Sequence, residues 1–173
     1  RAEISAILDR LRTLGIRNLV ALRGDEPKDG TALPLTQRDF AHASDLVRVV
    51  RERGGSRIAV AAYPEKHPES PSPEDDLRRF AEKVAAGGDW AVTQLFFDAR
   101  DYFSFVRRAR EAGVAVPIVP GIMPVTGYSQ LKRFSALCGV RIPPEFDERL
   151  APVQHDPQAV VSQGIDWAVR QCR

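Results

Sequence analysis

The sequence of 173 residues has little of what marks specialised classes of protein. Its two cysteines, Cys138 and Cys172, form no CxxC or Cys/His pattern, so we predict neither a zinc site nor any other metal site, and no disulfide framework. No apolar run approaches the roughly 18 residues that a membrane span needs, and the N-terminal segment has the pattern of an amphipathic helix rather than a signal peptide. We therefore expect a soluble, cytoplasmic chain with reduced thiols and no membrane partner.

An excess of charge of one sign is also absent. The chain has 25 Lys and Arg against 23 Asp and Glu, a formal net charge of +2, and the charges are interspersed. This balance gives no electrostatic footprint for a phosphate backbone, so no nucleic-acid partner is expected. The motifs GxGxxG after the first strand, GxxxxGKS/T, GxSxG and HExxH are missing, which argues against Rossmann dinucleotide binding, P-loop chemistry, serine-hydrolase chemistry and zinc-peptidase chemistry.

The informative feature that is present is a unit that recurs four times: an amphipathic helix, a glycine at its end, and a short β-branched apolar run that ends in polar or turn residues. Each run is short and uniformly apolar, which predicts a buried parallel strand. Ser72-Pro73-Glu74-Asp75 has the pattern of a helix N-terminus. The strand-bearing segments are LGIRNLVALRGD (14–25), GGSRIAVAAYPE (54–65), GGDWAVTQLFFD (87–98) and AGVAVPIVPGIMP (112–124), and the helices are expected at about 2–14, 39–53, 74–86 and 100–112.

After the fourth strand the pattern changes to helices at roughly 127–138, 144–150 and 156–171, with no fifth strand. The alternation of helix and strand predicts an α/β fold with right-handed crossovers. Four strands cannot close a barrel, and 173 residues is below the roughly 200 or more that a complete eight-unit barrel occupies. The chain is either an open doubly wound sheet or a segment of a barrel, and its start on a helix favours the second.

In both architectures ligands bind at the carboxyl ends of the strands. Gln94 interrupts an apolar run there, and a buried amide needs its hydrogen bonds met, either by a ligand or by a neighbouring loop. Other local alternatives are a surface pair of Arg23 with Asp25, a solvated His67, and a Lys83 that favours a helix C-terminus. The polar or small residues at the four strand ends are Arg23, Gly24 and Asp25; Tyr63, Glu65 and His67; Gln94 and Asp98; Gly121 and Pro124.

These strand ends, together with a later string, resemble methylenetetrahydrofolate reductase over essentially the whole chain. The resemblance implies a (β/α)8 TIM barrel that is incomplete here, because only four parallel strands are represented. These strands would be barrel strands four to seven. Residues 1–173 would form a single segment of the catalytic domain. It also implies FAD as cofactor and hydride transfer from NADH or NADPH through the flavin to 5,10-methylenetetrahydrofolate. The product would be 5-methyltetrahydrofolate, which is used for methionine synthesis. The full-length protein would be a homo-oligomer. The five strings are ALRGD (21–25), AAYPEKHPE (61–69), TQLFFD (93–98), PIVPGIMPV (117–125) and VRIPPE (140–145).

The resemblance also implies roles for individual residues. Asp25, near the pyrimidine edge of the flavin, and Gln94, an amide that hydrogen-bonds the pterin, are the expected catalytic residues. Gln130 and Phe134, four apart on one helix, are expected to bind substrate with Gln94, Phe134 as a stacking face. The expected cofactor-binding residues are Arg23, Gly24, Asp25, Ala43, Ala61, Tyr63, His67, Asp76, Lys83 and Val92.

Three parts of the family's site have no counterpart in this chain: the catalytic glutamate of the first barrel strand, a flavin-contacting histidine of the third, and a folate-contacting arginine of the last. Three alternatives therefore stay open. Another flavin barrel, such as a relative of proline dehydrogenase, should lack the YPExHPE and TQLFFD strings. A non-catalytic binding module would hold flavin or nucleotide without oxidising NAD(P)H, and a purely structural paralogue would bind no flavin.

Overall fold

The structure is a computed structural model that describes residues 2–24 and 39–173. The order of helices and strands is the one expected from the sequence. Ser72 begins the third helix as predicted, accepting a hydrogen bond from the Asp75 backbone N–H at 3.1 Å. The elements are α1 (Ala2–Thr13), β1 (Asn18–Ala21), α2 (Ala43–Arg53), β2 (Arg57–Ala62), α3 (Pro73–Ala85), β3 (Trp90–Leu95), α4 (Ala99–Glu111), β4 (Ile118–Gly121), α5 (Tyr128–Cys138), α6 (Pro144–Leu150), the 3-10 helix η2 (Ala151–Val153) and α7 (Pro157–Gln171).

One helix boundary differs from the prediction. The second helix was expected from about residue 39, but α2 begins at Ala43. His42 lies in extended backbone ahead of it, and its N–H donates to the Asp45 carboxylate at 2.9 Å. This bond satisfies a backbone donor before the helix starts, so the local capping chemistry sets the boundary.

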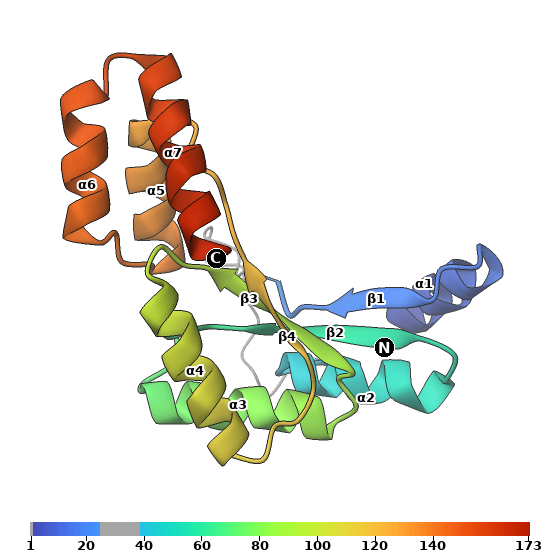
Figure 1. Cartoon of the computed structure of the whole chain (residues 1–173). Helices are drawn as coiled ribbons and strands as arrows, with labels where there is room; N and C mark the ends of the chain where they lie inside the picture. Colours follow the sequence, from blue (N-terminus) through green and yellow to red (C-terminus); the bar gives the residue numbers. More distant parts are fainter. Residues whose placement is uncertain (1, 25–38) are drawn as a thin grey trace.

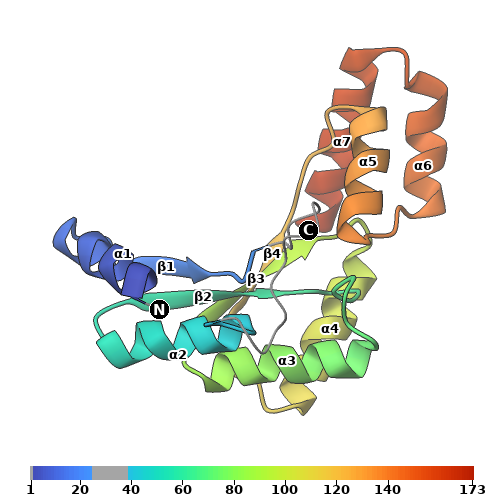
Figure 2. The same cartoon turned by 180° about the vertical axis from the view of Figure 1, so that it is seen from behind.

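The four strands form one parallel sheet in the order β1-β2-β3-β4, so each strand pairs with its neighbour in the chain. Helices α2, α3 and α4 all lie against the same face of the sheet (Figures 1 and 2). A doubly wound sheet reverses its strand order and carries helices on both faces. The observed winding is therefore that of a barrel, represented by four of its strands.

The main core lies between the sheet and these helices. The strand residues that face the helices, such as Ile58 and Val60 of the central strand β2, are fully buried against side chains including Val47 and Phe105. On the opposite face, which no helix covers within residues 2–24 and 39–173, Val20 of β1 is 59% exposed and Val119 of β4 is 43% exposed. The expectation of strands buried on both faces is wrong for these two edge strands, because covering that face needs elements other than the ones the structure describes.

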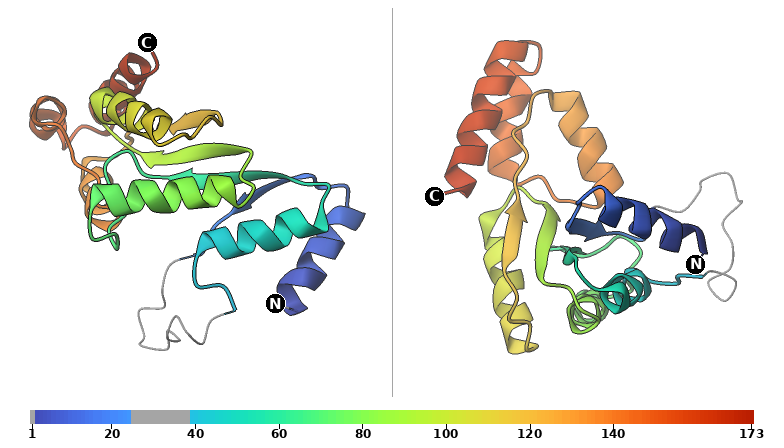
Figure 3. Two further views of the ribbon diagram at one scale, coloured as in Figure 1. Left: turned by 90° about the horizontal axis from the view of Figure 1, so that it is seen from below. Right: turned by 90° about the vertical axis from the view of Figure 1, so that its right-hand side faces the viewer.

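A second core lies among α5, α6 and α7, which stand together beyond the carboxyl ends of the strands (Figures 1 and 3). The indole of Trp167 stacks on Phe146, with ring centroids 4.4 Å apart, and its Nε1–H donates to the Phe97 carbonyl at 2.8 Å. Gln171 donates in the same way to the Phe96 carbonyl at 2.8 Å. Helix α7 therefore satisfies two backbone acceptors just after β3, which fixes the helical group to the end of the sheet. None of the helices in the described part of the chain is both long and apolar enough to cross a membrane.

Candidate functional site

The carboxyl end of β1 leads to Arg23 and Gly24. Arg23 forms an ion pair with Glu69, its guanidinium lying 2.7 and 2.8 Å from the two carboxylate oxygens. Gly24 has φ = 81°, and, apart from its chain neighbours, no atom of residues 2–24 and 39–173 lies within 4 Å of the position that a Cβ would take. The backbone of this segment is thus open to a neighbouring molecule. Asp25, expected to be catalytic, lies outside the described residues.

The loop after β2 brings Tyr63 and His67 together. Their rings meet edge to face, with centroids 4.6 Å apart. The Glu69 N–H donates to Nδ1 of His67 at 3.1 Å, so the neutral imidazole carries its proton on Nε2. Asp76, buried at the start of α3, accepts hydrogen bonds from Ser70 Oγ at 3.1 Å and from the His67 N–H at 3.3 Å. These contacts fix the imidazole as a hydrogen-bond donor at the end of the strand.

Gln94 lies at an irregularity in the sheet. Val92 pairs with Val119 and Leu95 with Gly121, so β3 has one more residue than β4 between these pairs. The residue of β4 opposite this bulge is Pro120, which has no N–H to donate to the ladder. Next to this irregularity Gln94 Oε1 accepts the Leu95 N–H at 2.9 Å, so a part of the amide stabilises its own strand.

The nitrogen of the Gln94 amide differs from its oxygen. Among the described residues, no acceptor is bonded to Nε2 of Gln94, and the side chain is only partly buried. Among the described residues, the Gln94 side chain bonds its own strand rather than a neighbouring loop carbonyl. Its N–H groups remain donors at the carboxyl edge of the sheet.

Lys83 of α3 lies beneath β2, where its ammonium donates to the Ala61 carbonyl at 2.6 Å. The Nζ is also 5.8 Å from the centre of the Tyr63 ring. Burial lowers the pKa of Lys83 to about 8, and the Asp76 carboxylate opposes this effect. The structure thus gives Lys83 a contact within the fold, and its expected contact with the cofactor stays a prediction.

The remaining expected residues lie on β2, β3 and α5 and at the start of α2. Ala61 and Val92 are paired in register and half-buried. Ala43 is the first residue of α2. Gln130 and Phe134 lie one turn apart on α5, where Thr126 Oγ1 donates to Gln130 Oε1 at 3.2 Å.

A small cavity of about 10 Å³ shows where three of these elements meet. Tyr63 and Gln94 line it from the ends of β2 and β3, and Cys138 lines it from the end of α5. Because Gln130, Phe134 and Cys138 are spaced four residues apart, they share one face of α5. The cavity is much smaller than a pterin ring, so it marks the contact of α5 with the strand ends rather than the space for a ligand.

A larger cavity of about 360 Å³ lies between the start of α4 and the helices α6 and α7. Its charged side chains are paired: Arg100 with Asp98 at 2.7 Å, and Arg170 with Glu145 at 3.7 Å. It therefore offers little unbalanced charge to recognise a ligand. Within the described residues, no group of three or more His, Cys, Asp or Glu side chains is placed to hold a metal ion.

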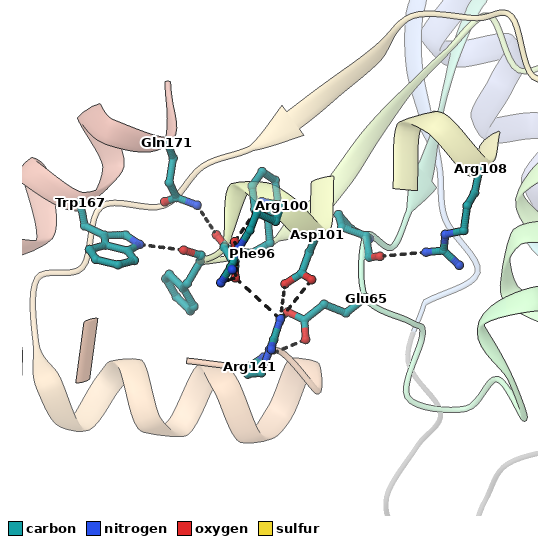
Figure 4. A network of polar contacts seen from close by, with 11 residues as sticks. Glu65, Phe96, Arg100, Asp101, Arg108, Arg141, Trp167 and Gln171 are labelled. Atoms are coloured by element: carbon teal, nitrogen blue, oxygen red, sulfur yellow. Dashed lines mark hydrogen bonds and ion pairs between the residues drawn. The ribbon is translucent and has the colours of Figure 1, made fainter. Parts of the chain in front are cut away.

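One contact network around the site was not identified from the sequence (Figure 4). The backbone N–H of Arg141 lies 3.1 Å from both carboxylate oxygens of Glu65, and its guanidinium binds Asp101 at 2.9 Å. Burial raises the pKa of Glu65, although the Arg141 N–H works against this. The strings that contain Glu65 and Arg141 were noted in the sequence, but nothing in them indicates that the two residues meet.

Comparison with known proteins identifies the family. The chain matches the family model of methylenetetrahydrofolate reductase over residues 1–173. It is 38% identical over 175 residues to the probable methylenetetrahydrofolate reductase (NADPH) of Caenorhabditis elegans, covering 100% of this chain and 26% of that protein. It is 41% identical over 169 residues to the 5,10-methylenetetrahydrofolate reductase of Pectobacterium carotovorum subsp. carotovorum, covering 98% of this chain and 55% of that protein. The chain thus spans about a quarter to about half of the length of these curated relatives.

A solved structure shares the fold. It is an uncharacterized protein from Clostridium thermocellum that binds two copies of 5-methyl-5,6,7,8-tetrahydrofolic acid. The TM-score is 0.51 and the sequence identity is 16%. The similarity covers 95% of this chain and 57% of the other chain. At this identity the likeness supports the fold alone. Because the family model covers the whole chain and curated relatives of the same name are 38% and 41% identical to it, the chain belongs to the methylenetetrahydrofolate reductase family, whose TIM barrel is incomplete here.

Proposed function

We propose that residues 1–173 form one segment of the catalytic domain of a flavin-dependent methylenetetrahydrofolate reductase. In the net reaction, 5,10-methylenetetrahydrofolate, NAD(P)H and a proton give 5-methyltetrahydrofolate and NAD(P)⁺. The hydride adds to the methylene carbon, whose bond to N10 of the p-aminobenzoyl part breaks. N10 takes the proton, and the carbon stays on N5 of the pterin as a methyl group. Relatives are named for NADPH in Caenorhabditis elegans and for NADH in Arabidopsis thaliana, so either donor is proposed. A cytoplasmic location and a homo-oligomeric full-length protein stay predictions.

The observation that carries this proposal is the meeting of Tyr63, Gln94 and the end of α5 around one cavity. A residue expected to contact flavin, a residue expected to contact pterin and the helix with two expected substrate residues come from separate parts of the chain. Their meeting at the carboxyl ends of parallel strands is the arrangement that barrel enzymes use for catalysis. It supports a site in which cofactor and folate lie against each other.

The residues at this edge fit a flat ring with polar edges, as FAD requires. Ala61 and Val92 present small apolar side chains on the face of the sheet that no described helix covers. His67 offers an Nε2–H donor, and the open backbone at Gly24 allows a close approach. FAD would supply the two-electron relay between the nicotinamide and the folate.

The protein's own residues would act by positioning. Gln94 would donate its Nε2–H groups to the pterin while Oε1 keeps its bond to the Leu95 N–H, so the amide cannot rotate freely. Phe134 would stack on a planar ring from α5, and Asp25 is proposed to hold and polarise the pterin together with Gln94. No proton donor is assigned among the described residues.

The test is the visible absorbance spectrum of the purified full-length protein after FAD is added and the excess is removed. We expect flavin bands to stay with the protein and His67→Ala to weaken their retention. His155→Ala, at an exposed histidine before α7, is the matched control and should retain flavin. A folded protein that retains no flavin would overturn the proposal.

Turnover then separates an enzyme from a binding module. NAD(P)H oxidation with menadione as acceptor, followed by reduction of methylenetetrahydrofolate, is expected of the enzyme. Gln94→Ala should lower the folate reaction while menadione turnover persists, and Gln158→Ala, at an exposed glutamine of α7, should change neither. Retention of flavin without NAD(P)H oxidation would favour the non-catalytic module.

A further inference from the structure

We propose that Glu65 is a positioning residue for the folate side of the site, because it holds the end of α5 against the end of β2. This inference rests on the proposed function, since it concerns the helix that carries Gln130 and Phe134. The Glu65 carboxylate accepts the Arg141 N–H, and we assign it no contact of its own with substrate or cofactor. Its effect would be exerted through the distance between α5 and Gln94.

The contact joins segments that are 76 residues apart in the chain. Both carboxylate oxygens of Glu65 lie 3.1 Å from the Arg141 backbone N–H, three residues after the last residue of α5. The donor belongs to the main chain and cannot rotate away as a side chain would. The contact therefore fixes the path of the backbone rather than one side chain.

The Arg141 side chain is engaged elsewhere. Its guanidinium binds the Asp101 carboxylate at 2.9 and 3.1 Å and lies 3.9 Å from Asp98, at the start of α4 (Figure 4). The segment after α5 is thus fixed at two points, by Glu65 through its backbone and by α4 through its side chain. The Glu65 contact ties it to the loop that follows β2 and begins with Tyr63.

Close packing at the end of α5 supports the same assignment. Gly139 ends the helix with φ = 65°, and a Cβ there would lie 3.2 Å from Pro68, which belongs to the same loop as Glu65. Glu65 also lines the cavity that Gln94 and Cys138 share. A shift of the loop would therefore be transmitted to the α5 face that carries Phe134.

The expected role needs an acceptor at the right reach rather than a negative charge. Two carboxylates, of Asp98 and Asp101, and one guanidinium, of Arg141, surround Glu65, so the charges around it do not favour a further negative charge. Glu65→Gln keeps the reach and one oxygen acceptor but loses the charge. Glu65→Asp keeps the charge but is one methylene shorter.

The experiment compares Glu65→Ala, Glu65→Gln and Glu65→Asp in the full-length, flavin-loaded protein, with Glu148→Ala at an exposed position of α6 as control. Since misplacement by about 1 Å can cost on the order of 100-fold, we expect the Ala and Asp variants to raise KM for methylenetetrahydrofolate by about tenfold. Menadione turnover and flavin retention should be unchanged. The Gln variant and the control should stay near the wild-type KM, and rescue by Asp instead of Gln would overturn the proposal.

Hydrogen exchange of the Arg141 amide tests the contact without reference to activity. The amide should exchange faster in Glu65→Ala than in the wild type and should keep its protection in Glu65→Gln. Equal protection in all variants would overturn the positioning role. A wild-type protein that protects this amide but neither binds flavin nor reduces folate would instead refute the proposed function and leave the contact established.

Discussion

Replacing Gly164 with alanine should destabilise the protein, although glycine to alanine in a helix normally stabilises it. Gly164 is buried in the middle of α7, where alanine would ordinarily gain about 1 kcal/mol. An added Cβ, however, would lie 2.0 Å from the Val125 carbonyl oxygen and 2.9 Å from its nitrogen. Both are backbone atoms of the segment between β4 and α5, so no side-chain rotation can relieve the overlap.

The size of the effect follows from the displacement that is needed. Even a tight contact of 3.0 Å requires α7 to move by about 1 Å. Overpacking of this kind costs about 1–3 kcal/mol, and the movement also stretches the 2.8 Å bond from Trp167 to the Phe97 carbonyl. After the propensity gain is subtracted, we expect a net loss of about 2 kcal/mol, a fall in Tm of roughly 4–8 °C for a domain of this size.

Urea unfolding followed by far-ultraviolet circular dichroism measures this loss. The matched control is Ser162→Ala, at an exposed position of the same helix, which should be neutral or gain up to about 0.5 kcal/mol. If Gly164→Ala proved as stable as the wild type while Ser162→Ala behaved as expected, the close approach of α7 to Val125 would be refuted.

Two other perturbations test buried polar groups. Burial lowers the pKa of Lys83 from 10.5 to about 8, so the unfolded chain binds more protons than the folded chain between these pH values. The free energy of unfolding should therefore rise from pH 8 to pH 10.5, by at most about 3 kcal/mol. Urea titrations across this window should show the rise in the wild type and a smaller one in Lys83→Met; identical slopes would contradict it. Trp167→Phe removes the donor to the buried Phe97 carbonyl and should cost about 1–3 kcal/mol in thermal unfolding, whereas an unchanged Tm would mean that another donor replaces the indole.

Features of the fold that depend on neighbouring residues could be predicted from the sequence. The cap at Ser72 and the positive φ of Gly54 are local, and they placed the helix ends correctly. The covering of a sheet face is not local. The apolar run around Val20 predicted burial on both faces, yet the side chain is 59% exposed, because periodicity records what a strand can bury and not which element lies over it.

The candidate site also has features that could be predicted from the sequence and features that could not. Gln94 could be identified because an amide inside an apolar strand is unusual. The bond from the Leu95 N–H to its oxygen could not, since it lies where the pairing of β3 with another strand is irregular. The contact of Glu65 with Arg141 spans 76 residues and uses a backbone donor, which leaves no trace in residue type. Sequence reasoning thus finds unusual side chains more readily than it finds the main-chain contacts that orient them.

The positions of Gln94 and of the helical group are therefore coupled through the main chain. Phe96 and Phe97 follow Gln94 by two and three residues, and their carbonyls accept hydrogen bonds from Gln171 and Trp167 of α7. A change that displaces α7 must act on the end of β3 as well as on the helical core. The loss of stability expected in Gly164→Ala should then be accompanied by a raised KM for folate, whereas a loss of stability alone would mean that β3 holds Gln94 without help from α7.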